Sequence, residues 1–181
     1  MTSVIGKRES AFGVTIVCHS VRVMIANRSA VIRELVLETL LDLEGFEPFL
    51  VAHVQDVIAQ LGNVKPHVVV LGSDMAVMND FETIREIRAC DPQLPIILLC
   101  LSAEARLKAI NEAFPAEAND HATFNVLMGH VASAKQHLHE ELVPKLRFWS
   151  DQYRDQTESN ESELAAHSGV MNGPIDFDSS V

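Results

Sequence analysis

Basic residues, cysteines and long apolar runs are all scarce in this chain of 181 residues. Lysine and arginine total 14 against 25 aspartates and glutamates, whereas binding to nucleic acid needs clustered positive charge. The three cysteines are odd in number and lack metal-ligand spacing, which favours reduced thiols over a disulfide framework. No apolar run approaches the roughly 18–20 residues of a membrane span. We therefore expect a cytoplasmic protein that binds neither nucleic acid nor membrane.

Short apolar runs alternate with helical patterns, and hydrophobic residues make up 48% of the chain. Strands are expected over residues 21–26, 48–51, 67–71, 95–101 and 120–124. Helices are expected between Asn27, a candidate N-cap, and Gly45, then over 54–61, 80–89, 103–113 and from about 127. Five β-then-α units in order imply an α/β fold with a doubly wound, five-stranded parallel sheet. In such sheets the working site lies beyond the carboxyl ends of the strands.

The two ends of the chain differ in composition from its middle. Residues 1–20 are expected to form a loosely ordered extension, and residues 21–149 to form the domain. Residues 151–181 contain seven acidic residues and one basic residue and few apolar ones, so 150–181 is predicted to be a disordered acidic tail. Pro144 is expected to kink or restart the last helix of the domain.

The run of residues 66–82 reads Pro-His-Val-Val-Val-Leu-Gly-Ser-Asp-Met-Ala-Val-Met-Asn-Asp-Phe-Glu. It resembles the phosphorylation loop of response-regulator receivers, PDVVLLDxxMPxMDGFE, with Gly72 at the position of the phosphoacceptor aspartate. The resemblance continues in Val21–Glu34, in Leu94–Ser102 and in Ala118–Asn125. Within the receivers, the segment His139–Arg147 is similar to the end of the regulatory domain of the chemotaxis methylesterase CheB. The resemblance implies a flavodoxin-like (CheY-like) fold, in which the final helix ends near residue 147. Because Trp149 and Tyr153 continue the helical spacing past that point, we expect an extended C-terminal helix.

The resemblance also implies which residues occupy the phosphorylation pocket. Receivers use two acids and the phosphoacceptor to hold Mg²⁺, and a hydroxyl and a lysine to hold the phosphoryl oxygens. Those positions are Asn27, Arg28, Gly72, Cys100 and Phe124 in this chain. All five are replaced, and Arg28 places a positive charge where the cation would sit. We therefore expect a pseudo-receiver with no catalytic residue, no metal, no other cofactor and no enzymatic activity.

Two alternatives keep a ligand or a phosphoryl group at this pocket. Asp74 lies two residues past Gly72 and is a candidate displaced phosphoacceptor, although a solvated loop residue is the simpler interpretation. Arg28 is a candidate anion site, because guanidinium groups suit small anions and nucleotides. An exposed or ion-paired arginine is the competing interpretation of Arg28.

The resemblance places signalling contacts on the face formed by the fourth helix, the fifth strand and the fifth helix. In this chain that face corresponds to residues 103–113 and 127–149, with a protein partner or a second copy of the chain bound there. His121 falls at the aromatic switch position of receivers, where an imidazole could respond to pH. Leu138, Leu142, Leu146 and Trp149 recur at helical spacing and form either a core face or a contact surface. The expected function is protein–protein contact in two-component or chemotaxis-type bacterial signalling, without phosphotransfer.

Overall fold

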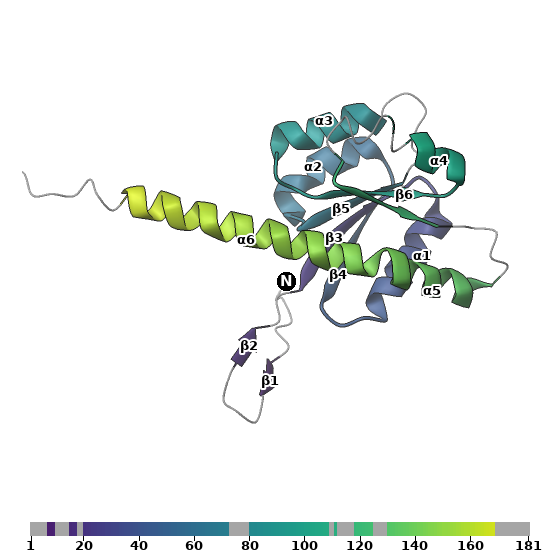
Figure 1. Ribbon diagram of the computed structural model, residues 1–181, viewed down its shortest axis with the longest axis horizontal. Coiled ribbons are helices and arrows are strands. Elements are labelled where there is room, and N and C mark those ends of the chain that lie inside the picture. Colours follow the sequence, from purple (N-terminus) through teal and green to yellow (C-terminus); the bar gives the residue numbers. More distant parts are fainter. Residues whose placement is uncertain are drawn as a thin grey trace, which may run out of the picture.

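Figure 1 shows the computed structural model, which describes residues 7–9, 15–17, 20–72, 80–108, 111, 118–124 and 130–168. Its elements are, in order, β1 (Lys7–Glu9), β2 (Thr15–Val17), β3 (Val21–Ala26), α1 (Ala30–Leu41), β4 (Phe46–Val51), α2 (Val54–Val64), β5 (Val68–Gly72), α3 (Asp80–Cys90), β6 (Ile96–Cys100), α4 (Ala103–Lys108), β7 (Asp120–Thr123), α5 (Val131–Glu141) and α6 (Val143–Ser168). Strands β1 and β2 pair antiparallel within the N-terminal extension. None of the helices in these ranges is long and apolar enough to span a membrane.

The main sheet has the strand order β4-β3-β5-β6-β7, and every pairing in it is parallel. This arrangement confirms the predicted doubly wound α/β fold. The chain enters this sheet at β3, adds β4 on one side of it, and then adds β5 on the other side. The order of strands therefore reverses between β3 and β5, and ligands of doubly wound folds bind in the crevice at such a reversal.

Helices cover both faces of the sheet, so its strands are apolar on both sides. In β3, Val23 and Ile25 face the core shared with α1 and α5, whereas Met24 and Ala26 face the core shared with α2 and α3. Figure 1 shows these two pairs of helices on opposite sides of the sheet. The strands thus form the middle layer of a three-layer structure, and their carboxyl ends converge at one edge.

Two helices differ from the expected boundaries. Helix α2 continues through Gly62 to Val64 and ends where Lys65 adopts a left-handed conformation, with φ of 47°. Helix α4 is described only to Lys108, and the rest of the expected helix, apart from Asn111, lies outside the described residues. Glycine lowers helix propensity but does not stop a helix by itself when the amphipathic pattern continues past it.

The C-terminal part differs most from the sequence-based expectation. Helix α5 ends at Glu141 and α6 starts at Val143, with Pro144 in its first turn, as predicted for a restart. The predicted disordered tail differs from the structure, because α6 continues without a break to Ser168. Between Pro144 and Gly169 the sequence contains neither proline nor glycine, so nothing in it interrupts the helix. Residues 169–181 lie outside the described residues.

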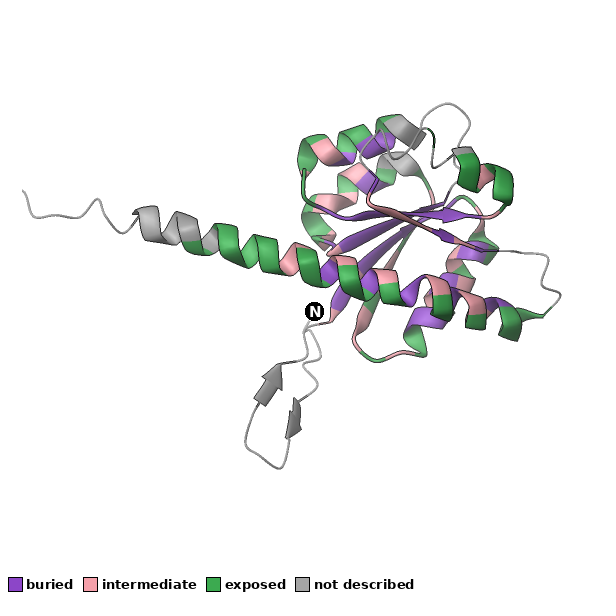
Figure 2. Cartoon of the chain, in the orientation of Figure 1, coloured by how far each residue is buried: buried purple, intermediate pink, exposed green. Residues whose placement is uncertain are grey.

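Helix α6 crosses the amino edge of the sheet, where the strands begin. It contacts β3 and β5, and it packs Trp149 against the core on one face and Tyr153 against the core on the other. Ser150, between them, is fully buried. Figure 2 shows mixed burial over the first turns of α6 and exposed residues beyond them. The helix is therefore part of the domain up to Tyr153 and extends into solvent after it.

Candidate functional site

The residues predicted for the pocket lie at the carboxyl edge of the sheet, as the topology requires. Asn27 follows β3, Gly72 ends β5, Cys100 ends β6, and Phe124 follows β7. The backbone N–H of Phe124 donates to the carbonyl of Cys100 at 2.8 Å, which joins the last two strands there. The structure thus brings four of the five positions to one edge, and Arg28 is exposed beside Asn27.

Asn27 fills the space in front of Gly72. Its side chain is 1% exposed, and a Cβ atom built on Gly72 would lie 2.0 Å from Asn27 Nδ2 and 2.7 Å from Asn27 Cγ. Asn27 Oδ1 accepts the backbone N–H of Ser29 at 2.8 Å. Asn27 Nδ2 has no hydrogen-bond partner within the described part of the chain. A side chain at position 72 therefore has no room while Asn27 keeps this position.

The loop between β3 and α1 is fixed by its own residues. Arg33 Nη1 donates to the carbonyl of Asn27 at 2.6 Å and to that of Arg28 at 3.0 Å. Ser29, rather than Asn27, is the N-cap of α1, and its side chain accepts the N–H of Ile32 at 3.4 Å. Asn27 acts one step earlier by receiving the N–H of Ser29, so both polar side chains shape the entry into α1.

Cys100 and Phe124 are core residues rather than groups presented to a ligand. Each is 1% exposed, with Cys100 in the cluster facing α2 and α3 and Phe124 in the cluster facing α1 and α5. They therefore contribute to packing on opposite faces of the sheet.

The resemblance to receivers implies Mg²⁺ at this edge, but the residues present do not fit that ion. Mg²⁺ prefers carboxylate oxygens and water, and none of Asn27, Arg28, Gly72, Cys100 and Phe124 carries a carboxylate. Asn27 Oδ1 is already bonded to the backbone of Ser29. Among the residues that the structure describes, no group of three or more histidine, cysteine, aspartate or glutamate side chains is arranged to hold a metal. Asp74, the candidate displaced phosphoacceptor, lies outside the described residues.

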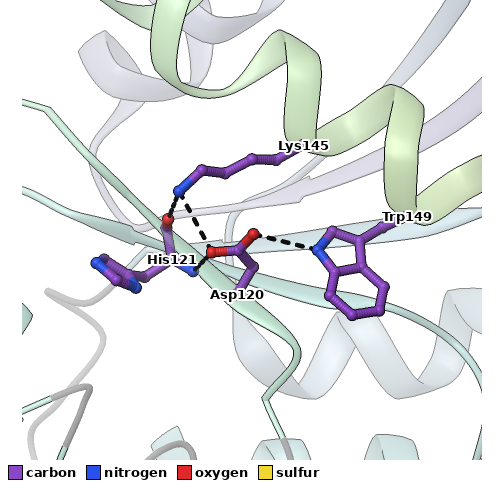
Figure 3. Close-up of polar contacts among 4 residues, drawn as sticks. All are labelled: Asp120, His121, Lys145 and Trp149. Atoms are coloured by element: carbon purple, nitrogen blue, oxygen red, sulfur yellow. Dashed lines mark hydrogen bonds and ion pairs between the residues drawn. The ribbon is translucent and has the colours of Figure 1, made fainter.

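A second polar cluster lies at β7, where Asp120 joins that strand to α6 (Figure 3). Asp120 Oδ1 accepts the backbone N–H of His121 at 2.7 Å and lies 3.2 Å from Lys145 Nζ. Asp120 Oδ2 accepts Trp149 Nε1 at 3.2 Å, and Lys145 Nζ also donates to the carbonyl of His121. Asp120 and Lys145 are not among the site residues predicted from the sequence. The only available signal was the spacing of Lys145 and Trp149, which places both on one face of a helix.

The imidazole of His121 points away from this cluster in Figure 3 and is partly buried. Burial lowers the pKa of His121 below its ordinary value of 6.5, and the positive charge of Lys145 lowers it further. The carboxylates of Asp120 and Glu141 act in the opposite direction, and the guanidinium of Arg106 acts in the same direction as Lys145. The neutral form of His121 is therefore favoured in the folded protein.

A third contact fixes α6 one turn further along. Tyr153 Oη donates to Asp91 Oδ2 at 2.7 Å, and Asp91 Oδ1 accepts the N–H groups of Gln93 and Leu94. Burial, and then the bond to Asp91, raises the pKa of Tyr153 above its ordinary value of 10.0. Asp91 thus connects the loop between α3 and β6 to α6.

The structure corrects three of the four residues proposed for a contact surface. Leu138, Leu142 and Leu146 are buried in the core between the sheet and the helical region of α5 and α6. Their helical spacing is therefore that of a core face. Trp149 is partly buried and shares an edge-to-face contact with Phe148, with 5.2 Å between ring centroids. Phe148 is 57% exposed and Leu107, on α4, is 62% exposed. Among the side chains of α4 and α6 whose burial the structure describes, these two are the large apolar ones that are exposed.

Comparison with known proteins agrees with this geometry. The response regulator receiver domain family matches residues 23–123. A protein-glutamate methylesterase/protein-glutamine glutaminase of Trichodesmium erythraeum (strain IMS101) is 27% identical over 127 residues, which cover 70% of this chain and 36% of the relative. The chain thus spans about a third of the length of the curated relatives that it matches.

Solved structures of receivers share the fold. The response regulator domain of Thermotoga maritima CheB gives a TM-score of 0.59 at 17% identity, covering 74% of this chain and 98% of that domain. The chemotaxis response regulator CheY4 of Vibrio cholerae gives a TM-score of 0.56 at 21% identity, covering 70% of this chain and 98% of that protein. The family match, the strand order and the position of the altered pocket lead to one conclusion. The chain belongs to the response regulator receiver domain family, whose members act in two-component and chemotaxis signalling.

Proposed function

We propose that this receiver transmits its signal through contact with a protein partner and does not accept a phosphoryl group. The observation that carries the proposal is the pair Gly72 and Asn27, in which the phosphoacceptor side chain is missing and its space is filled. Phosphoryl transfer depends on positioning and charge neutralisation, and Arg28, Cys100 and Phe124 supply no oxygen ligand for Mg²⁺. The protein accordingly catalyses no reaction of its own, and it acts in the cytoplasm.

The partner surface in this proposal is the face of α4, β7 and α6. Leu107 and Phe148 are its exposed large apolar side chains, and Arg106 carries positive charge on α4, whereas the charge of Lys145 is paired with Asp120. Apolar side chains with a positive neighbour suit a partner that presents apolar and acidic residues. A second copy of the chain is the alternative occupant of this face.

The test is co-purification of partners from native cells with the wild-type chain and two surface variants. Phe148→Glu is expected to lose the partner, because it places a charge in the centre of the proposed contact. Val31→Glu is the matched control, since Val31 is 72% exposed but lies on α1. A partner retained by Phe148→Glu, or lost equally from both variants, would refute this surface. Labelling of the wild-type chain by acetyl phosphate would refute the proposal that it is not phosphorylated.

A small-anion or nucleotide sensor at Arg28 is a second candidate function. The exposed guanidinium of Arg28 lies immediately before the N-terminus of α1, where backbone N–H groups favour negative charge. A thermal shift with phosphate or a nucleotide that disappears in Arg28→Ala would support it. Labelling by acetyl phosphate that disappears in Asp74→Asn would instead support a displaced phosphoacceptor.

A further inference from the structure

The backbone of β5 does not require a glycine at position 72. Gly72 is the last residue of a buried strand and pairs in regular parallel register with Leu99. Its φ angle lies outside the left-handed region that only glycine adopts readily, so an L-residue suits this backbone. A glycine inside a strand then marks the close approach of another group. The group that approaches here is the side chain of Asn27.

Asn27 is held in this position at three points. Its N–H donates to the carbonyl of Val51 at 3.2 Å, its carbonyl accepts Arg33 Nη1, and its Oδ1 accepts the N–H of Ser29. Rotation of the side chain away from Gly72 would break the bond to Ser29, which helps to form the turn into α1. The clash between a Cβ atom at position 72 and the Nδ2 and Cγ atoms of Asn27 is therefore relieved only if the bond to Ser29 is given up.

The contact lies at the reversal of strand order between β3 and β5. That crevice is where doubly wound folds bind ligands, because the connections after β3 and β5 lead to helices on opposite faces of the sheet and leave room between them. In this chain the carboxamide of Asn27 occupies the inner part of the crevice, directly in front of Gly72.

We propose that Asn27 is an internal plug that occupies the volume of the missing phosphoacceptor side chain, and that Gly72 is required to admit it. This inference deepens the proposed function and rests on it for its biological meaning, since the plug closes the pocket from within. Positions 27 and 72 then form a coupled pair. While Asn27 keeps the position set by its bond to Ser29, a side chain is tolerated at position 72 only when the side chain at position 27 is made smaller.

A double-mutant cycle in thermal unfolding of the full chain tests the coupling. Gly72→Ala alone is expected to lower Tm by about 5 °C or more, as overpacking in a domain of this size does. In the Asn27→Ala background the same substitution is expected to lower Tm by less than about 1 °C. If Gly72→Ala alone fails to fold, recovery of a folded protein in the Asn27→Ala/Gly72→Ala variant is the expected result. Equal effects of Gly72→Ala in both backgrounds would overturn the proposal.

Two further variants test whether the loss in Tm comes from the volume of the side chain at position 27 or from adding a methyl group to a glycine. Asn27→Asp has the same shape as asparagine, so Gly72→Ala is expected to remain costly in that background. Gly62→Ala is the control for adding a methyl group to a glycine, because nothing lies within 4 Å of its Cβ position in α2, and Tm is expected to stay unchanged or rise. Relief of the Gly72→Ala penalty by Asn27→Asp would overturn the plug. If co-purification detects no partner, the proposed function is refuted, but the outcome of this double-mutant cycle does not change.

Discussion

The two edges of the parallel sheet are closed by different kinds of interaction. At the carboxyl edge, the positions that carry chemistry in receivers hold a buried amide, a glycine, a buried thiol and a buried phenyl ring, with Arg28 exposed beside them. At the amino edge, α6 crosses the sheet and is fixed by polar groups from three successive turns. Lys145 and Trp149 bind Asp120, and Tyr153 binds Asp91.

The carboxyl edge is thus closed by buried side chains that pack in the two cores, whereas the amino edge is closed by the polar attachment of α6. The attachment of α6 holds the surface of that helix, including Phe148, at a fixed position relative to β7. A module that works through contact needs such a fixed surface more than it needs a reactive pocket.

The largest effect is expected at the carboxyl edge, from Phe124→Lys. This substitution restores the lysine position of receivers but buries an unpaired ammonium group and removes a core phenyl ring. We expect a loss of more than about 4 kcal/mol in the free energy of unfolding, measured by urea denaturation. Phe148→Lys is the matched control, because its ring is mostly exposed, and it is expected to cost less than about 0.5 kcal/mol. Equal costs for the two variants would mean that Phe124 is not part of the core.

A smaller effect is expected at the amino edge, from truncation after Ser150. This removes Tyr153, its contacts with the second core and its bond to Asp91, for a loss of about 2–3 kcal/mol. The corresponding decrease in Tm is roughly 4–12 °C, measured by circular dichroism. Truncation after residue 160 removes only the part of α6 that lies beyond these contacts and is expected to change Tm by less than about 1 °C. If the shorter chain is as stable as the longer one, the attachment at the amino edge contributes nothing measurable.

The smallest effect is expected from the protonation of His121 at β7. Its pKa in the folded protein lies below the value of 6.5 for the unfolded chain, so the unfolded chain binds more protons in that interval. Stability from this group is therefore complete above pH 6.5 and is lost as the pH falls through the folded pKa. We expect a contribution below about 1 kcal/mol, because solvent screens a partly exposed group. His121→Phe should show a weaker decrease in Tm than the wild type between pH 7.5 and 5.5, and parallel curves would exclude a role for this imidazole.

Local patterns in the sequence predicted most of the fold. The strand at Val21–Ala26 matches the prediction at both ends, and the alternation of five apolar runs with helical patterns correctly gave the parallel sheet. The family motif placed Gly72, Cys100 and Phe124 at strand ends, where the structure has them. These features were predictable because periodicity and motif spacing are properties of neighbouring residues.

The helical region that includes Leu138, Leu142 and Leu146, which the structure divides into α5 and α6, was predicted, but its role was not. The same spacing describes a core face and a contact surface, and only the packing of α5 and α6 on the sheet identified it as core. Composition alone suggested disorder after residue 150, because polar residues dominate there. Anchoring by Trp149 and Tyr153 keeps the first turns of that segment helical, and composition cannot report such contacts.

The sequence by itself identified the chain as a receiver and predicted that all five pocket positions are replaced, because both inferences depend only on residue identity at motif positions. Only the tertiary structure decided what the replacements do. Asn27 and Gly72 are 45 positions apart, and their contact exists because β3 and β5 are adjacent strands. The bonds from Asp120 to Trp149 and from Asp91 to Tyr153 likewise join residues 29 and 62 positions apart. Contacts of this range depend on how the layers pack, which no local pattern contains.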